Sequence, residues 1–311
     1  MSNIANVHTT GDVYQSQCEH FALVYDGVDD LCRRLAPSLR RAADEGGAVL
    51  VCLDDHAAAK VRADFGAVSD SFVFVSATQR YATPGVAMAQ LDRFVGDALT
   101  SGAPTAWSIG SIPLGGDRAD IGWIRYEGAV TTLFADHALR AVCLYDAAAT
   151  PSAVRDSVHR THQSVDGEWI SAHHEILAAL SDDLCPLRAA DLTLFDAEPR
   201  AVRAAIDVLF ADLSSTGSVA DLRLVATELV TNALVHGIPP AEVRIWRDGP
   251  VWVLQVRDTG TSEIDAYADL RRCTGGAHGG FGMFTVGQLA DAVHIARDAR
   301  GNTVTALFVT R

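Results

Sequence analysis

The chain has 311 residues, of which 49% are apolar, so it is long enough for two domains that each bury a core. A net charge of −14 argues against direct binding to nucleic acid or to an anionic membrane. Most of this charge lies in residues 1–187, which carry 24 acids and 13 bases, against 15 acids and 12 arginines in residues 188–311. Lys60 is the only lysine, which excludes a P-loop and most Schiff-base chemistry.

The sequence lacks a membrane or export signal: it has no run of 18 apolar residues, and its N-terminus has no basic region followed by an apolar one. We therefore expect a cytoplasmic protein. Residues 1–18 are expected to be a disordered tail, residues 19–182 a first domain and residues 183–311 a second. The six cysteines are scattered without a CxxC pair, so buried reduced thiols are expected in place of disulfides or a zinc site.

In the first domain, short apolar runs alternate with helical segments. The runs are residues 20–27, 48–54, 72–77, 105–111 and 140–146. Such strands, separated by helices, indicate a parallel sheet covered on both faces, a three-layer α/β fold of Rossmann-like type. The segment DGVDD after the first run has three acids that would repel phosphate, so we expect this domain to sense a ligand or contact a protein and not to bind ATP.

A ligand of such a domain is expected at the carboxyl ends of its strands. We would test Tyr25, Tyr81, Trp123 and Glu127, because aromatic rings beside one carboxylate suit a mostly apolar ligand with a single polar anchor. The alternative is that these aromatic side chains simply belong to the core.

The junction between the domains is rich in histidine and invites a metal hypothesis through His159, His162, His173, His174 and Glu175. Polar residues on an exposed connecting helix are the simpler explanation. The run HHEIL is also similar to the phospho-accepting box of histidine kinases. About 20 residues before the next strand are too few for the helical hairpin that such a box requires.

The second domain is organised around the segment DLRLVATELVTNALVHG, residues 221–237. Glu228, Asn232 and His236 are spaced four residues apart and therefore lie along one face of a predicted helix. Ser218 is expected to cap this helix and Gly237 to end it. The polar row either forms hydrogen bonds within the helix or provides a metal–phosphate site, with Asn232 giving an oxygen to Mg²⁺ and Glu228 near the phosphate.

The rest of this domain predicts a two-layer α/β sandwich, with helices on one face of a largely antiparallel sheet. The expected elements are strands at 190–195, 242–247, 251–257, 293–297 and 303–310 and helices at 199–213 and 283–289. Asp258 ends a strand and Gly260 follows it, and the glycine-rich run of residues 275–282 precedes a helix, whose N-terminus offers N–H groups to phosphates.

These pieces resemble the N box and the two glycine boxes of the GHKL ATPase superfamily, which has the Bergerat fold, and in particular its anti-sigma-factor serine/threonine kinase branch. The resemblance covers about residues 188–311. It implies binding of ATP and Mg²⁺ by Asn232 (the Mg²⁺ ligand), Glu228 (the general base), Asp258 (the adenine anchor), Gly260, Gly280, Gly282 and Thr303. The run Gly260-Thr261-Ser262 departs from the family pattern, which has a second glycine two residues after the first.

The loop between the two glycine boxes carries the acids Glu263, Asp265 and Asp269 and is expected to be a solvated lid. Arg271 and Arg272 are expected to reach the phosphates in place of the missing lysine.

The first domain resembles the MEDS domain, a sensory domain related to the RecA-like fold. The resemblance rests on four segments: HFALVYDG from His20, WIRYEG at residues 123–128, CLYD from Cys143, and HRTH ending at His162. Gln163 stands where the resemblance leads us to expect a proline.

Together the two resemblances imply an anti-sigma regulatory factor whose kinase domain is controlled by a sensory domain. Its expected partners are a sigma factor, an anti-anti-sigma antagonist of the STAS type, a small-molecule ligand of the sensory domain and a second copy of the chain. The alternative function is a nucleotide-dependent switch that binds partners without phosphoryl transfer.

Overall fold

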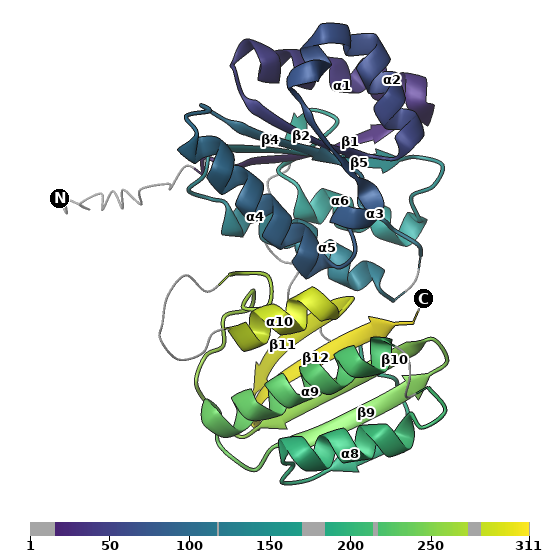
Figure 1. Ribbon diagram of the computed structural model, residues 1–311, viewed down its shortest axis with the longest axis vertical. Helices are drawn as coiled ribbons and strands as arrows, with labels where there is room; N and C mark the ends of the chain where they lie inside the picture. The colour runs from purple at the N-terminus through teal and green to yellow at the C-terminus, as the bar shows by residue number, and fades with distance from the viewer. Residues whose placement is uncertain (1–15, 117, 170–183, 214–216, 273–280, 311) are drawn as a thin grey trace, which may run out of the picture.

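The computed structural model describes residues 16–116, 118–169, 184–213, 217–272 and 281–310. They form two α/β units that follow one another along the chain and pack together (Figure 1). Most of the expected tail, the junction residues His173, His174 and Glu175, and Gly280 of the glycine-rich loop lie outside the described residues. No helix in the described ranges is long and apolar enough to cross a membrane.

The first unit is built on a sheet with the strand order β3-β2-β4-β5-β1-β6-β7. Its strands are β1 Glu19–Tyr25, β2 Ala48–Leu53, β3 Val73–Ser76, β4 Ala106–Gly110, β5 Leu139–Asp146, β6 Ser164–Val165 and β7 Glu168–Trp169. The five predicted strands are all present and pair in parallel, and β7 runs antiparallel at the edge.

Helices cover both faces of this sheet, which confirms the predicted three-layer arrangement. The elements are α1 (Gly27–Asp44) and α2 (Asp55–Phe65) on one face, and α4 (Pro84–Thr100), α5 (Asp120–Leu133) and α6 (Ser152–Thr161) on the other. A 3-10 helix (Gly66–Ser71) and α3 (Ala77–Arg80) connect neighbouring elements. Side chains alternate between the two faces, so Val142 of β5 packs with α1 and α2 whereas Ala141 and Cys143 belong to the core beneath α5.

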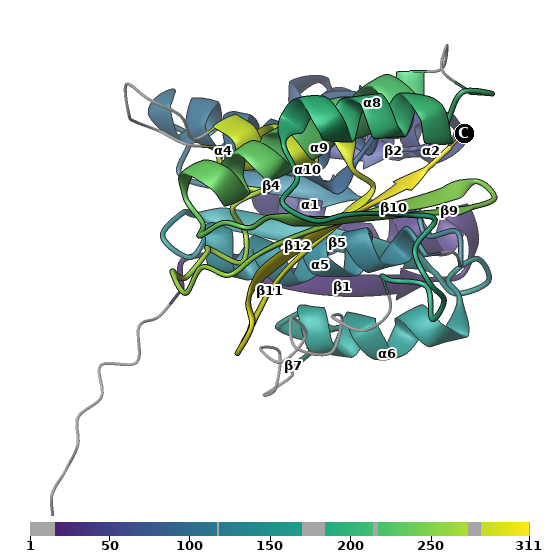
Figure 2. The same ribbon diagram turned by 90° about the horizontal axis from the view of Figure 1, so that it is seen from below.

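The second unit is an antiparallel sheet with the order β11-β12-β10-β9-β8 and helices on one face, as predicted (Figure 2). Its elements are β8 (Leu192–Leu194), α8 (Pro199–Leu209), α9 (Gly217–Val235), β9 (Glu242–Asp248), β10 (Val251–Asp258), α10 (Phe281–Leu289), β11 (Ala292–Asp298) and β12 (Gly301–Val309). The expected cap at Ser218 is wrong, because α9 already begins at Gly217 and Ser218 lies inside its first turn.

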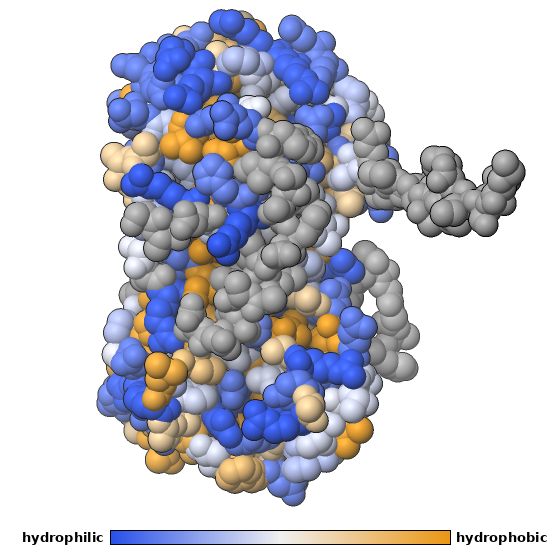
Figure 3. Space-filling model, turned by 180° about the vertical axis from the view of Figure 1, so that it is seen from behind, coloured by the Kyte–Doolittle hydropathy of each residue, from blue (hydrophilic) through white to orange (hydrophobic). Residues whose placement is uncertain are grey.

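The second sheet does not leave its other face open to water. Trp246, Val253 and Leu307 are buried on that face, and Ile121 of α5 packs against them. Seen from behind, hydrophobic residues show in the waist between the units, whereas hydrophilic residues dominate the outer end of the first unit (Figure 3). The first domain therefore completes the burial of the second sheet.

Two glycines allow helices of the first unit to lie directly against the backbone of the second unit. A Cβ added to Gly85 of α4 would lie 2.1 Å from the carbonyl oxygen of Gly287 in α10. A Cβ on Gly122 of α5 would lie 2.1 Å from the carbonyl oxygen of Asp291, beside β11. Real Cβ atoms do not approach backbone atoms this closely, so a larger residue at either position must push the units apart.

We predict that Gly85→Ala weakens the packing of the two units, because its methyl group collides with rigid backbone. The matched control is Gly96→Ala on the same helix, where the added methyl meets nothing within 4 Å. The control should raise the unfolding free energy by up to about 1 kcal/mol through helix propensity. Calorimetry should show a lower midpoint or a split transition for Gly85→Ala alone. Equal midpoints for the two variants would contradict the close approach of α4 and α10.

Candidate functional site

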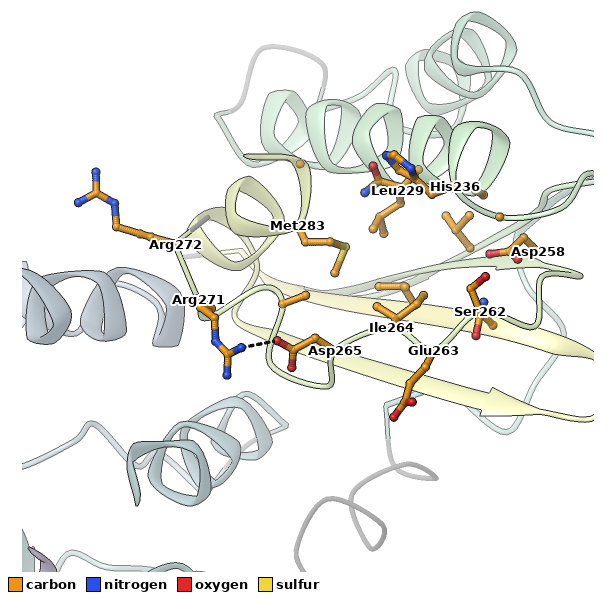
Figure 4. A pocket seen from close by; sticks show the side chains of 18 residues that line it. Leu229, His236, Asp258, Ser262, Glu263, Ile264, Asp265, Arg271, Arg272 and Met283 are labelled. Atoms are coloured by element: carbon orange, nitrogen blue, oxygen red, sulfur yellow. Dashed lines mark ion pairs between the residues drawn. The ribbon is translucent and has the colours of Figure 1, made fainter. Parts of the chain in front are cut away.

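A pocket of about 570 Å³ lies between α9, α10 and the second sheet, within the size range of small-molecule sites (Figure 4). Figure 4 shows Asp258 near one end of the pocket and Arg271 and Arg272 toward the other. The lining residues are Leu229, Asn232, Ala233, His236, Gly237, Val256, Asp258, Ser262, Glu263, Ile264, Asp265, Ala268, Arg271, Arg272, Gly282, Met283, Asn302 and Val304.

Asp258 is buried at the end of β10 and is held between two glycines. A Cβ on Gly237 would lie 2.5 Å from the Asp258 carboxyl carbon, and one on Gly260 would lie 2.5 Å from Oδ1. Gly260 N donates a hydrogen bond of 2.6 Å to Oδ1. No described residue donates a hydrogen bond to Oδ2, so this oxygen can accept one from a ligand. The glycines thus fix a carboxylate acceptor on the wall of the pocket.

Glu228 and Asn232 lie one turn apart on α9 and meet the first turn of α10. A Cβ on Gly282 would lie 2.9 Å from Glu228 Oε2 and 3.3 Å from Asn232 Oδ1. The described part of α10 runs from Phe281, and in this described part the N–H of Gly282 has no carbonyl partner one turn earlier, so it is available at the positive end of the helix dipole. A carboxylate, a carboxamide and a helix N-terminus therefore converge at one place.

The structure brings most of the predicted site residues together. Asn232, Asp258 and Gly282 line the pocket, whereas Glu228 and Gly260 lie directly behind it against lining groups. Thr303 does not line the pocket: its neighbours Asn302 and Val304 do, and alternation along β12 directs Thr303 to the other face of the sheet.

Gly237 and Asn302 line the pocket, but the sequence did not indicate either as a site residue. Gly237 was expected only to end the helix, and Asn302 was passed over for Thr303. The signal that could have indicated Asn302 is its pairing with Asp258 across the β10–β12 ladder, which a correct strand register would have given.

The expectation of a solvated acidic lid is wrong for Asp269. This residue is 1% exposed, and its carboxylate pairs with Arg125 of α5, with Nη2 2.6 Å from Oδ1 and Nη1 2.8 Å from Oδ2. Arg125 Nη2 also donates to the carbonyl oxygen of Ala266, and its guanidinium lies 5.6 Å from the centre of the Tyr267 ring. Leu270 is buried among core residues of the first domain. The segment 265–272 is therefore held by the first domain.

The two arginines expected to reach phosphate differ in their surroundings. Arg271 Nη1 lies 3.0 Å from Asp265 Oδ2, in an exposed ion pair at the edge of the pocket. Arg272 is exposed and points away from Leu229 and Met283 (Figure 4). Neither side chain is fixed by burial, so both are free to move toward a bound anion.

The donor set fits a purine nucleotide with Mg²⁺. Apolar side chains, among them Leu229, Val256 and Met283, suit a flat base, and Asp258 offers the acceptor that an exocyclic amine requires. Asn232 offers an oxygen of the type that Mg²⁺ takes. Gly282 leaves the space in which a Cβ would meet Glu228 and Asn232. Asn232 would hold the ion, and Gly282 N–H would face the phosphates.

The residues proposed for a ligand in the first domain are mostly core. Tyr81 and Trp123 are buried and pack edge to face with ring centres 5.6 Å apart, and burial raises the pKa of Tyr81 well above its usual value. Glu127 is 1% exposed and lies between two histidines, not at a strand end. Tyr25 alone of the four is at a strand end and partly exposed.

The second unit is a two-layer α/β domain with a pocket whose residues suit a nucleotide, and it is joined to a three-layer α/β domain. Comparison with protein families agrees with these two classes. Residues 19–163 match the family MEDS, described as "MEthanogen/methylotroph, DcmR Sensory domain". Residues 195–308 match the family described as "Histidine kinase-like ATPase domain". The chain therefore carries a MEDS domain followed by a histidine kinase-like ATPase domain, and the latter supports ATP binding and a kinase or ATPase activity.

No curated protein matches the chain significantly. Among solved structures, one similar chain is the histidine kinase domain of the E. coli osmosensor EnvZ, determined by NMR. The match has 13% sequence identity and a TM-score of 0.22, and it covers 41% of this chain and 93% of that one.

We predict that Asp258→Asn lowers the affinity for ATP by about 10- to 100-fold, since the amide keeps the acceptor for Gly260 N but presents a donor to the adenine amine. The same change should improve binding of GTP relative to ATP, because guanine has a carbonyl at that position. Isothermal titration of the full chain with both nucleotides measures this. Asp248→Asn, at the exposed end of β9 and outside the pocket lining, is the control and should change neither affinity by more than about threefold. An unchanged ratio of the two affinities in Asp258→Asn would contradict the adenine contact.

Proposed function

We propose that this protein is an anti-sigma regulatory factor with serine/threonine kinase activity, which uses ATP and Mg²⁺ to phosphorylate an anti-anti-sigma antagonist of the STAS type. The observation that supports it most is the meeting of Glu228 and Asn232 with Gly282 at the N-terminus of α10. Asp258 lies at a separate place on the pocket wall, as expected if base and phosphates occupy different ends. The first domain controls the activity.

In this proposal the side chains do two things: they position the nucleotide and its metal ion, and one of them accepts a proton from the substrate hydroxyl. Bound ATP and Mg²⁺ supply the phosphoryl group and offset its charge. Asn232 would hold the ion, and the N–H of Gly282 would contribute a donor where negative charge gathers. Glu228 would accept the proton of the serine or threonine hydroxyl, whose oxygen would take the terminal phosphoryl group while ADP leaves.

We predict that Glu228→Gln reduces phosphoryl transfer at least ~100-fold while ATP affinity stays within about threefold, because the amide has the same size but cannot take the proton. The measurement is incubation of the full chain with labelled ATP, Mg²⁺ and candidate small antagonist proteins. Glu263→Gln is the matched control: it removes a carboxylate that lines the pocket but not the one beside Gly282, and transfer should continue.

The rival function, a nucleotide-dependent binding switch, gives a different pattern in the same experiment. A switch would transfer no phosphate to any antagonist, and its ATP-dependent affinity for a partner would survive Glu228→Gln. Label found on the chain itself, at a histidine, would instead favour a histidine kinase.

Control by the first domain is supported by the contacts of Arg125. This side chain is buried and reaches across from α5 to the segment 265–272, part of which lines the nucleotide pocket. A shift of α5 would therefore move Asp265, Ala268 and their neighbours relative to Asp258.

We predict that Asp269→Asn lowers the unfolding free energy by ~3–5 kcal/mol, because it leaves the buried Arg125 charge uncompensated. Adding Arg125→Met should recover much of this loss but leave ATP affinity altered, since the pocket segment is no longer anchored. The control cycle uses the exposed pair Arg271 and Asp265 on the same segment, which should couple by less than ~1 kcal/mol. Urea unfolding and titration with ATP supply both readouts. Equal coupling energies in the two cycles would count against the anchoring role.

A further inference from the structure

Four metal-ligating side chains meet inside the first domain, away from the nucleotide pocket: His20, Glu127, Cys143 and His162. They come from β1, α5, β5 and the residue that follows α6. Each of the four segments that carry the resemblance to MEDS domains supplies one of them. His20, Glu127 and His162 are at most 1% exposed, and Cys143 is partly buried. No component of the proposed kinase site uses any of the four.

The register of the sheet explains why these residues converge. His20 on β1 lies beside Ala141 on β5, and Cys143 lies beside Ala22, so both reactive side chains project to the face covered by α5 and α6. Glu127 projects from α5 toward the sheet, where it meets the two histidines. His162 closes the group from α6, and its ring lies 4.2 Å from that of His20, centre to centre.

The ligand atoms surround one point. Glu127 Oε2 is 2.9 Å from His20 Nε2, 3.3 Å from His162 Nε2 and 3.0 Å from Cys143 Sγ. His20 Nε2 and Cys143 Sγ are 3.2 Å apart, and all four atoms lie within 4.8 Å of one another. Tetrahedral zinc with ligands at ~2.0–2.3 Å spaces its ligand atoms ~3.3–3.6 Å apart. The close pairs therefore need to open by a few tenths of an ångström, and a pair near 4.8 Å needs to close by about 1 Å.

The hydrogen bonds on the far side of the rings favour tautomers whose other nitrogen faces the centre with a lone pair. His162 Nδ1 is 3.0 Å from the carbonyl oxygen of Val158, which only accepts, and 2.8 Å from Thr161 Oγ1, so the carbonyl is satisfied in the tautomer with the proton on Nδ1. Nε2 of a neutral His162 then turns a lone pair toward the Glu127 carboxylate, and a cation between them removes this repulsion. His20 Nδ1 lies 3.3 Å from Thr131 Oγ1, which leaves its Nε2 facing the same centre. Bonds of this kind, from the outer ring nitrogen, orient histidine ligands in metal sites.

Two buried polar atoms of the cluster form no hydrogen bond of normal geometry with the described residues. Glu127 Oε1 has no hydrogen bond from the described residues, and His162 Nε2 lies near Oε2 without the alignment of one. Such atoms are costly to bury. A divalent cation with one carboxylate, one thiolate and two neutral imidazoles also forms a group of zero net charge, which suits a dry interior.

We propose that His20, Glu127, Cys143 and His162 form a Zn²⁺ site in the sensory domain. Mixed nitrogen, sulfur and oxygen ligands in four-coordinate arrangement are typical of zinc. Four protein ligands leave no open position, so the ion is structural or regulatory and not catalytic. It clamps β1, β5, α5 and the end of α6 together. Glu127 is two residues from Arg125 on α5, which connects this clamp to the segment beside the nucleotide pocket.

The first test is metal content of the full chain. Protein loaded with Zn²⁺ and then passed through gel filtration should retain about one zinc per chain by mass spectrometry. Loading with Co²⁺ in place of zinc should give a thiolate-to-cobalt absorption band, which reports a bound cysteine directly and needs no variant. A folded wild-type chain that retains no zinc and shows no such band overturns the proposal.

The second test compares matched variants. Cys143→Ala and His162→Gln should lower zinc affinity, measured against a chromophoric chelator, by at least ~10- to 100-fold. Cys52→Ala, a buried thiol on β2 of the same sheet, and His159→Gln, an exposed histidine one turn earlier on α6, should not. Changing both His173 and His174 to Gln should also leave zinc affinity unchanged, because these junction histidines are not part of the proposed site. If zinc is retained equally by Cys143→Ala and His162→Gln, the ion binds elsewhere and the proposal fails.

Zinc should also raise the thermal midpoint of the wild-type chain, and raise that of Cys143→Ser by much less at the same zinc concentration, because stabilisation by a ligand grows with its affinity for the folded state. A metal-free wild-type cluster held together by imidazolium–carboxylate pairs alone would show no shift with zinc, and this result too would overturn the assignment.

Discussion

One buried ion pair, Arg125 with Asp269, ties the border of the pocket in the second domain to a helix of the first. Both side chains are almost fully removed from water, and burying two charges is tolerable only when their geometry is good and their other hydrogen bonds are satisfied. Here the pair has two short contacts, and Arg125 also donates to a backbone carbonyl and lies against Tyr267. The pair therefore fixes the loop that borders the nucleotide pocket to a helix of the other domain.

That helix, α5, belongs to both domains in physical terms. Ile121 packs on the face of the second sheet that its own helices do not cover, Gly122 meets the backbone at Asp291, and Arg125 reaches the pocket segment. Glu127 faces the opposite way, into the first sheet and its histidines. Helical periodicity makes this possible, because residues two apart project to nearly opposite sides. A shift of α5 caused by a change around Glu127 would therefore be passed through packed atoms to the pocket segment.

Within the pocket, glycines leave the space that the polar side chains occupy. Gly237 and Gly260 leave room for the Asp258 carboxylate, and Gly282 lets the first turn of α10 lie against Glu228 and Asn232. In each case a single Cβ would occupy space now taken by a polar group. The glycines therefore decide where the carboxylates lie, and the helices and strands hold the glycines in place.

The sequence alone determined the two fold classes, and it predicted residues that the structure brings together at one pocket, because apolar periodicity and turn residues are local signals, and Glu228, Asn232 and Asp258 lie in segments with strong helix or strand patterns. It did not determine that Asp269 is buried, since its partner Arg125 lies 144 residues earlier and the local run of acids resembles a solvated loop. Nor did it bring His20, Glu127, Cys143 and His162 together. Their convergence depends on strand register and on which face each helix covers, and those are decided only when distant segments pack.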